Sequence, residues 1–415
     1  MKIGLLGQFG SGNTGNDGSL EAMVNFLRKT RSDAELLCIC SNPDAIAKQY
    51  KIKAIGIGGT IAQGRWFQRI NGVLAGVPRR FLTLYSLFGQ LDGLTLLIIP
   101  GTGILDDFQE NPFGWPFVVF RWCLAARLRR IRIAFVSIGA GPIEHPLSRW
   151  FLKAAAQMAQ YRSYRDDYSL QYVESIGVDV SRDWRYPDIA FRLPVPDPLP
   201  VKNDTHITVG VGVMDYHGWS KTDTDADAIH QNYTGKLAAY IGWLLEQGYN
   251  VRLLTGDLRD GKAVKKVLDK IAATGSDVSP ERITSTCSQS LHELMDTIAQ
   301  TDFVIVSRYH NVVSALKLGR PTISLSYNKK NDYLLAQFGQ QHYCQNIETF
   351  DVEELKRQTQ SVMENIDAVR LQIDNCNRAL QEKLSEQEAL LLDRVISPRR
   401  ERIRRQSGDM IRRPS

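Results

Sequence analysis

The chain has 415 residues, of which 43% are hydrophobic and 23% are charged. This composition is typical of a globular protein, and the length is too great for one ordinary hydrophobic core, so we expect two domains. The formal net charge is +6, but much of the excess lies in the last stretch, SPRRERIRRQSGDMIRRPS. Because the remainder is near neutral, we do not expect a nucleic-acid groove across the folded body.

Cysteine usage and hydropathy together favour a cytoplasmic protein. The six cysteines are scattered, with no CxxC pair and no Cys/His spacing typical of a metal site. A reduced protein without a bound metal follows from this pattern. The N-terminus, MKIGLLGQFGSGN, becomes glycine-rich too early for a signal peptide, and no run of about 20 apolar residues suits a transmembrane helix.

The first predicted strand, from Lys2 to Leu6, runs into a glycine-rich loop. Three glycines of this loop fit the pattern GxGxxG: Gly10, Gly12 and Gly15. A helix follows, which we expect Asp17 or Ser19 to cap, and such a helix start favours an anion. The next strand, from Glu35 to Ile39, ends in Cys40-Ser41-Asn42, without the acidic residue that binds a ribose. We therefore interpret the loop as lining a cleft rather than binding NAD.

A second glycine-rich turn follows the buried strand predicted from Leu94 to Pro100. Its sequence, GTGILDDF, places Gly101 and Gly103 just before the carboxylate pair Asp106 and Asp107. Ligands bind outside the carboxyl ends of the strands in parallel sheets, so either carboxylate is a candidate general base. The alternative is that the pair only caps the following helix.

The clearest linker is RLPVPDPLPVKND, which holds four prolines. The pattern of strand, glycine and helix starts again beyond it, at Ile207. We therefore expect an α/β protein with two Rossmann-like domains. The predicted boundaries are an N-terminal domain over 1–193, a linker over 194–204, a C-terminal domain over 205–345, C-terminal helices over 346–395 and a disordered basic tail over 396–415.

The most informative stretch of the second half runs from Thr301 to Gly339. Phe303 to Val306 is a short apolar run typical of a buried strand, and Arg308 and His310 follow where the strand gives way to a helix. Arg308 offers a rigid charged fork for a carboxylate or phosphate, and His310 can transfer a proton near neutral pH. The alternative is that Arg308 pairs with a neighbouring carboxylate and His310 caps the helix.

Six motifs, in chain order, resemble the polysaccharide pyruvyl transferase family. They are GNTGND (12–17), PGTGILDD (100–107), SIGAGPIEHPLSR (137–149), SYRDDYSLQYVESIGV (163–178), YPDIAF (186–191) and SRYHNVVSALKLGRPTISLSYNKK (307–330). The arginine–x–histidine element and the tyrosine–x–x–lysine element are the most specific. Family members usually carry GNxGDE in the first loop, where this chain has Asn16 and Asp17.

The resemblance implies two Rossmann-like domains that face each other across a cleft, similar to the GT-B arrangement, with the acceptor on the N-terminal side. It implies transfer of the carboxyvinyl unit of phosphoenolpyruvate to two hydroxyls of a sugar, with release of phosphate. Arg308 then binds the donor, His310 is the catalytic histidine, and Lys330, with Lys329 as its rival, is the second cation. Further substrate contacts are expected from the two glycine-rich turns: Gly12, Asn13, Gly15, Asp17, Gly101 and Gly103.

The resemblance leaves the general base open among three carboxylates: Asp106, Asp107 and Asp17. No metal and no cofactor are expected, with phosphoenolpyruvate as co-substrate. The expected acceptor is a glycan or a lipid-linked sugar, selected by the segment from Ile55 to Arg80 and the loop Asp215–Trp219. The basic tail is expected to allow peripheral contact with the inner membrane face.

Two other functions are compatible with the sequence. A GT-B glycosyltransferase would hold the diphosphate of a nucleotide sugar in the same cleft, but it would need a glutamate for the ribose, and none with that role is evident after Pro321. A non-catalytic glycan-binding partner of the same fold is the second alternative, which the unusual GNTGND loop keeps open.

Overall fold

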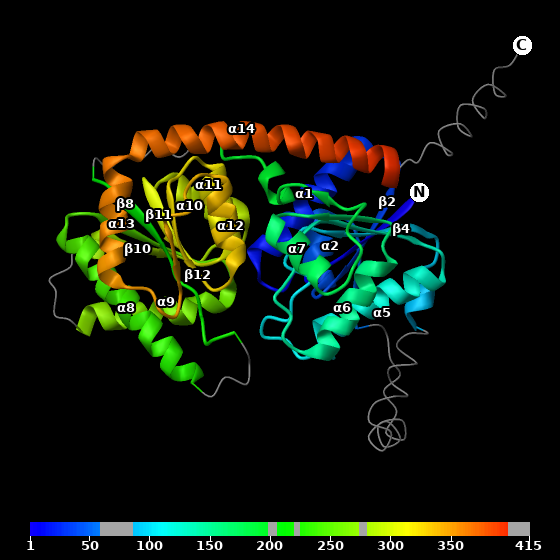
Figure 1. Ribbon diagram of the computed structural model, residues 1–415, viewed down its shortest axis with the longest axis horizontal. Coiled ribbons are helices and arrows are strands. Elements are labelled where there is room, and N and C mark those ends of the chain that lie inside the picture. The colour runs from blue at the N-terminus through cyan, green and yellow to red at the C-terminus, as the bar shows by residue number, and fades with distance from the viewer. Residues whose placement is uncertain (59–85, 198–205, 220–224, 274–279, 397–415) are drawn as a thin grey trace, which may run out of the picture.

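Two α/β domains lie side by side in the computed structural model, and one long helix joins them (Figure 1). The structure describes residues 1–58, 86–197, 206–219, 225–273 and 280–396. Every pair of neighbouring strands in these residues is parallel. The expected α/β fold with two Rossmann-like domains is therefore confirmed.

The N-terminal domain contains a seven-stranded sheet in the order β3-β2-β1-β4-β5-β6-β7. Its strands are β1 (Lys2–Leu6), β2 (Glu35–Cys40), β3 (Lys53–Gly56), β4 (Leu94–Pro100), β5 (Arg132–Ile138), β6 (Tyr161–Tyr164) and β7 (Trp184–Arg185). Its helices are α1 (Thr14–Thr30), α2 (Pro43–Tyr50), α5 (Trp115–Leu128), α6 (Pro146–Met158), α7 (Asp167–Ser175) and the 3₁₀ helix η1 (Ile189–Arg192).

The C-terminal domain contains a six-stranded sheet in the order β10-β9-β8-β11-β12-β13. Its strands are β8 (Thr208–Gly212), β9 (Asn250–Leu254), β10 (Ile283–Thr286), β11 (Phe303–Val306), β12 (Thr322–Ser326) and β13 (Cys344–Asn346). Its helices are α8 (Ala226–Glu246), η2 (Leu258–Asp260), α9 (Gly261–Ala273), η3 (Pro280–Arg282), α10 (Leu291–Ala299), α11 (Tyr309–Lys317) and α12 (Lys329–Gln337).

The strand order reverses once in each sheet, between β1 and β4 and between β8 and β11. The chain leaves neighbouring strands in opposite directions at such a point, which opens a crevice at their carboxyl ends. The loops after these four strands carry the glycine-rich turns, the loop that contains Trp219, and the pair Arg308 and His310. The fold therefore brings together segments that lie about 300 residues apart in sequence.

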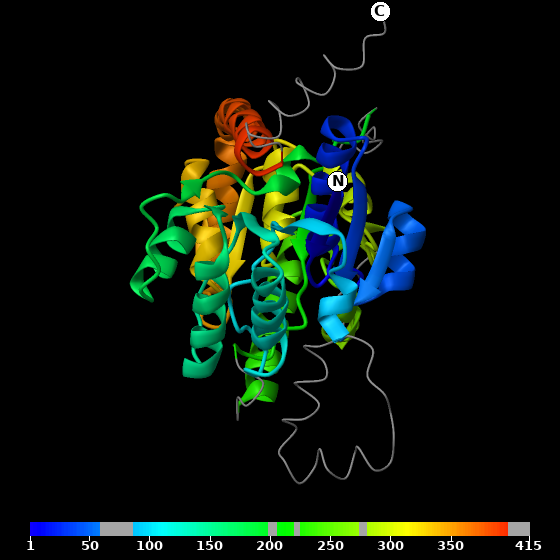
Figure 2. The same cartoon turned by 90° about the vertical axis from the view of Figure 1, so that its right-hand side faces the viewer.

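The last helices close the fold: α13 (Val352–Glu364), α14 (Ile366–Leu390) and a π-helical turn (Leu391–Ile396). Helix α14 runs along one edge of both domains (Figure 1) and is seen nearly end on after a 90° turn (Figure 2). The side chain of Asn377 donates to the Leu316 carbonyl of the C-terminal domain at 2.8 Å. The buried side chain of Gln387 donates to Ser137 and Ser163 of the N-terminal domain, at 2.7 and 3.0 Å.

One apolar cluster continues from the N-terminal domain into the C-terminal domain. It includes Leu20 of α1, Leu291 of α10 and Val312 of α11, and Ile373 and Leu384 of α14 cover it. Two further clusters occupy the outer faces of the two sheets. The interface between the domains is therefore a hydrophobic core that positions the two sets of loops against each other.

Some expectations are corrected and others fall outside the described residues. Helix α1 is capped by Asn13, whose side chain accepts from the amides of Gly15 and Asn16, and not by Asp17 or Ser19. Most of the segment from Ile55 to Arg80, most of the expected linker and nearly all of the basic tail lie outside the described part of the chain. All six cysteines are free. Among the described helices, none is both long and apolar enough to cross a membrane.

Candidate active site

A cavity of about 200 Å³ lies between the two domains, at the carboxyl ends of their strands. The N-terminal domain contributes the first glycine-rich loop, the turn after β4 and Arg165 at the end of β6. The C-terminal domain contributes Arg308 and His310 at the start of α11, and Tyr327 and Lys330 around the start of α12. The structure therefore brings the arginine–x–histidine and tyrosine–x–x–lysine elements into one site.

Arg308 lines this cavity and also forms an ion pair with Asp260. Its Nε and one Nη donate to the two carboxylate oxygens of Asp260 at 2.6 and 2.5 Å. The Asp260 side chain is fully buried and also accepts from the amides of Asp215, Gly256 and Asp257, at 3.0, 3.1 and 3.1 Å. Burial alone would lower the pKa of the guanidinium, but Asp260 and Asp257 raise it overall. The charge and orientation of Arg308 are therefore fixed before any ligand arrives.

His310 is packed against the start of α1 in the other domain. A Cβ atom added to Gly15 would come within 2.0 Å of its Nδ1, so only glycine allows this approach. Its Nε2 has no hydrogen-bond partner among the described residues and lies 3.7 Å from Oδ2 of Asp188. Burial lowers the pKa of His310 to about 4, Asp188 offsets this in part, and Arg165 lowers it further. The ring is therefore neutral at pH 7 in the ligand-free protein, with a nitrogen available for proton transfer.

Lys330 makes an ion pair that crosses the cleft. Its buried Nζ donates to Oδ2 of Asp106 at 2.7 Å. Burial lowers the pKa of Lys330, and Asp106 opposes that shift. The rival Lys329 is not among the residues that line the cavity. The second cation is therefore tied to a carboxylate that a competing anion would have to displace.

The two carboxylates after β4 point in different directions. Asp106 lines the cavity, whereas both oxygens of buried Asp107 accept backbone amides, from Glu144 at 3.0 Å and His145 at 2.9 Å. Asp107 therefore fixes the entry to α6 and lies outside the cavity lining. Gly103 has no Cβ to fill the space beside the Asp106 carboxylate, where an added Cβ would come within 3.1 Å of Oδ2.

The first glycine-rich loop has less room for an anion than its sequence indicates. The Thr14 amide donates to the Gly256 carbonyl of the other domain at 3.3 Å, and the next two amides donate to the Asn13 side chain. Asp17 is turned inward, where Oδ1 accepts the Gly10 amide at 2.7 Å. Burial raises the pKa of Asp17 to about 6. The amides of the loop therefore make contacts between and within the domains, and Asp17 does not line the cavity.

The sequence analysis did not single out Arg165 and Asp188 as site residues. Nη1 of Arg165 donates to Oδ2 of Asp188 at 3.1 Å, and its guanidinium lies 3.5 Å from the centre of the Tyr309 ring. Both side chains are almost fully buried, and Arg165 lines the cavity. A signal was present, because each charged residue follows closely after a short strand.

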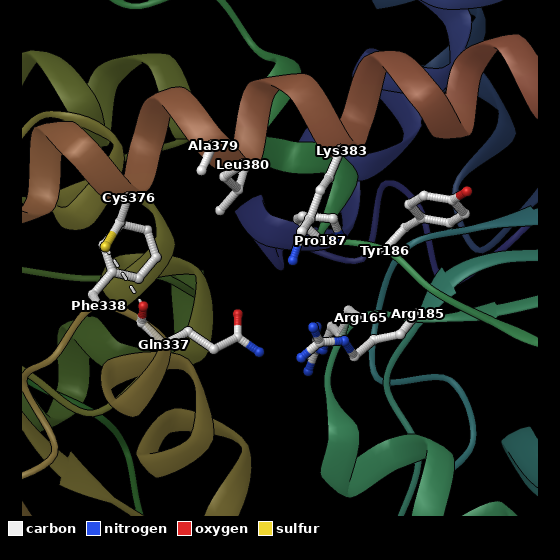
Figure 3. A pocket seen from close by; sticks show the side chains of 10 residues that line it. All are labelled: Arg165, Arg185, Tyr186, Pro187, Gln337, Phe338, Cys376, Ala379, Leu380 and Lys383. Atoms are coloured by element: carbon white, nitrogen blue, oxygen red, sulfur yellow. Dashed lines mark hydrogen bonds between the residues drawn. The ribbon is translucent and has the colours of Figure 1, made fainter.

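Arg165 also borders a second hollow, of about 210 Å³, on the α14 side (Figure 3). Arg185 and Lys383 point into it from the N-terminal domain and from α14, and Gln337 reaches in from α12. Phe338 and Leu380 give it an apolar wall. The buried guanidinium of Arg165 thus forms part of the wall of both hollows.

A polar cluster follows β8, close to Asp260. Asp215, His217 and His230 hold donor atoms within 4.8 Å of one another. However, the two imidazole rings stack in parallel, 4.2 Å apart at 3°, and His230 Nδ1 bonds to the Tyr216 carbonyl at 3.0 Å. Lone pairs of imidazoles lie in the ring plane, so two stacked rings do not direct them at one ion. The contacts of the cluster therefore stabilise the loop that carries Trp219.

The comparisons with known proteins agree with this architecture. The S. aureus MnaA–UDP structure is 11% identical, with a TM-score of 0.59, and covers 90% of both chains. The UDP-GlcNAc 2-epimerase from Neisseria meningitidis bound to UDP-GlcNAc is 10% identical, with a TM-score of 0.59, over 93% of this chain and 100% of that one. Anabaena HepE in complex with UDP-glucose is 12% identical, with a TM-score of 0.59, over 94% and 99%. At such identities the likeness shows the GT-B-like fold alone.

The family assignment comes from the sequence comparison. No curated protein matches the chain significantly. The sequence profile of the polysaccharide pyruvyl transferase family, in contrast, matches residues 13–329. This range contains most of the residues that line the cavity, from Asn13 to Asn328, and leaves out Gln8 and Lys330 at its two ends. The chain therefore belongs to the polysaccharide pyruvyl transferase family.

Proposed function

We propose that the protein transfers a pyruvyl group from phosphoenolpyruvate to a sugar of a polysaccharide or its precursor, forming a pyruvate ketal and releasing phosphate. The observation that carries this proposal is the set of buried cations around one neutral histidine. Arg165 and Lys330, which are buried, and Arg308, whose side chain is 13% exposed, line the same cavity as His310, and both domains complete it. Phosphoenolpyruvate is small and carries a phosphate and a carboxylate, which suits such a set of cations.

The site can take up these anionic groups at two places. Asp260 uses only two of the donor nitrogens of Arg308, so N–H groups remain for the ligand. Helix α11 starts beside the cavity with no side-chain cap among the described residues, so its first amides and its dipole favour an anion. Lys330 becomes available when the ligand replaces Asp106. The donor is therefore bound at the start of α11, with Lys330 closing the site from α12.

Proton transfer follows from the state of His310. A ligand with two or three negative charges raises the pKa of a neighbouring imidazole, so binding of the donor converts neutral His310 into a proton donor. The proton goes to the methylene carbon C3, and positive charge develops at C2. One sugar oxygen bonds to C2, the C2–O bond to phosphate breaks, and a second sugar oxygen takes the place of the phosphate. Two hydroxyl protons are released, one of which balances the proton given to C3.

A nucleotide-sugar donor is the second candidate, because the structures named above hold UDP or UDP-sugars. Such a donor needs a carboxylate for its ribose. The candidate for this carboxylate is Glu348, which follows β13. Its Oε1 accepts a hydrogen bond from the Tyr216 hydroxyl at 2.5 Å. Glu348 is not among the described residues that line the cavity. The arrangement therefore supports phosphoenolpyruvate over a nucleotide sugar.

Two substitutions test the donor site. Arg308→Lys replaces a planar guanidinium, which can donate two parallel hydrogen bonds to one anion, by a single ammonium group. We therefore expect donor affinity to fall by about 10–150-fold, which corresponds to roughly 1.5–3 kcal/mol. His310→Gln should keep donor affinity within a few fold and lower turnover by about 10²-fold or more. Donor affinity is measured by calorimetry and turnover by phosphate release with a competent acceptor. Turnover near that of the parent in His310→Gln would show that the histidine is structural.

A further inference from the structure

We propose that the acceptor is a neutral sugar and that Glu110 receives the proton of its attacking hydroxyl. The sugar binds in a third space, different from the one in Figure 3 and called the hollow below. It lies next to the cavity between the domains, which is called the donor cavity below. This inference rests on the proposed function. The hollow has a volume of about 480 Å³. It shares six lining residues with the donor cavity: Gln8, Asn13, Asn16, Glu110, Trp115 and Arg259. The two spaces are therefore adjacent, and a sugar in the hollow lies beside the donor.

The hollow presents hydrogen-bonding groups suited to sugar hydroxyls. The amides of Gln8 and Asn16 line it, and neither side chain makes a hydrogen bond elsewhere in the described structure. Ser11 and Ser41 add two hydroxyls to the lining. Amides and hydroxyls both donate and accept hydrogen bonds, as sugar hydroxyls do, and they add no charge. The hollow therefore favours a polyhydroxylated ligand.

The charges of the lining exclude an acidic sugar. Asp257 and Arg259 neutralise each other through two hydrogen bonds of 3.0 Å. Glu110 is then the one charged group without an opposite partner among the described residues of the hollow. A uronate or a phosphorylated sugar would bring a second negative charge beside Glu110 with no cation to balance it. The donor cavity, in contrast, is lined by four cationic side chains and two carboxylates.

Glu110 lies at the junction of the two spaces. Its Oε2 accepts the amide of Trp115, at the start of α5, with a length of 3.5 Å. A Cβ atom added to Gly114 would come within 2.4 Å of that oxygen, so the carboxylate lies directly over the turn. No hydrogen bond to Oε1 is formed by the described residues. Asp106 faces the donor cavity only and is tied to Lys330 at 2.7 Å. Glu110 is therefore the better-placed carboxylate for an incoming hydroxyl.

The proton balance assigns a defined step to this residue. The hydroxyl oxygen of the acceptor bonds to C2 of the donor, while its O–H bond breaks and the proton moves to a Glu110 oxygen. After release of phosphate, the same carboxylate passes the proton to solvent through the open side of the hollow. The residue touches the reacting hydroxyl, so its removal lowers turnover and does not weaken donor binding.

The first test measures binding of the acceptor alone and does not require turnover. Saturation-transfer NMR on the full-length protein, without donor, compares neutral methyl hexosides with methyl glucuronide and a hexose phosphate. We expect the neutral methyl hexosides to bind the parent and Asn16→Ala to weaken that binding by about 2–10-fold, as expected for one lost hydrogen bond. Preference for the acidic sugars, or equal binding to parent and Asn16→Ala, overturns the assignment of the hollow.

The second test isolates Glu110. Glu110→Gln is compared with Glu144→Gln, a substitution of an exposed glutamate that lines neither space. We expect Glu110→Gln to bind the donor at least as tightly as the parent, to lower kcat by about 10²-fold and to remove the acidic limb of the pH profile, whereas Glu144→Gln resembles the parent. Equal behaviour of the two variants overturns the role of Glu110. A parent that neither binds phosphoenolpyruvate nor releases phosphate refutes the proposed function instead, and the NMR experiment still decides on the hollow.

Discussion

The buried state of His310 predicts how the stability of the protein depends on pH. Its folded-state pKa, about 4, lies below the ordinary value of 6.5, so below pH 6.5 the unfolded chain binds a proton that the native protein does not. The contribution of His310 to stability is therefore fully present above pH 6.5 and is lost as pH falls toward 4. Each pH unit in this window is worth about 1.36 kcal/mol, so lowering the pH from 7 to 5 should cost about 2 kcal/mol.

Urea unfolding at pH 7 and pH 5 measures this effect. The parent should lose about 2 kcal/mol more than His310→Gln between the two pH values. His342→Gln, which removes an exposed imidazole, serves as the control and should resemble the parent. Saturating phosphoenolpyruvate should abolish the difference between parent and His310→Gln, because its charges raise the pKa of His310. Equal losses in the parent and in His310→Gln would refute the buried, neutral state of the histidine.

Three further predictions follow from other contacts. Asp17 has a pKa raised by burial to about 6, so its ionisation costs stability as pH rises from about 4 through 6; Asp17→Asn should raise the free energy of unfolding at pH 7 by about 1–3 kcal/mol in urea titrations. Gly15→Ala places a Cβ 2.0 Å from His310 Nδ1, so turnover should fall more than 10-fold in phosphate-release assays while circular dichroism stays unchanged. Gln387→Ala removes one hydrogen-bond partner from each of the buried hydroxyls of Ser137 and Ser163, and Ser163 keeps the Ser137 amide; it should cost about 1–3 kcal/mol in thermal unfolding.

The features that depend on local sequence were predictable. Runs of β-branched residues followed by glycine and a helix indicate parallel strands, and such a pattern repeated after a proline-rich linker indicates a second domain. The placement of Arg308 and His310 follows from the same rule, because both come directly after the strand β11. Only two residues separate the end of β11 from the start of α11, so the positions of these side chains vary little.

The features that depend on domain docking were not predictable from local sequence. Arg165 lies at the site, paired with Asp188, because the N-terminal domain packs against α11. The sequence shows that each residue follows a short strand, but it does not show the contact of Arg165 with Tyr309. Asp106 and Asp107 are adjacent in an irregular turn, so the sequence does not show which one faces the cleft. The cap of α1 was missed for a different reason: Asn13 is itself a favoured cap, and the helix begins earlier than the glycines suggest.

The central claim is that the donor is phosphoenolpyruvate, and product release tests it most directly. The protein is incubated with a panel of neutral glycans and either phosphoenolpyruvate or UDP-sugars, while inorganic phosphate and UDP are assayed in parallel. The structure leads us to expect acceptor-dependent release of phosphate from phosphoenolpyruvate, with a new ketal carbon in the NMR spectrum of the glycan. Acceptor-dependent release of UDP, with no phosphate from phosphoenolpyruvate, would contradict the proposed function.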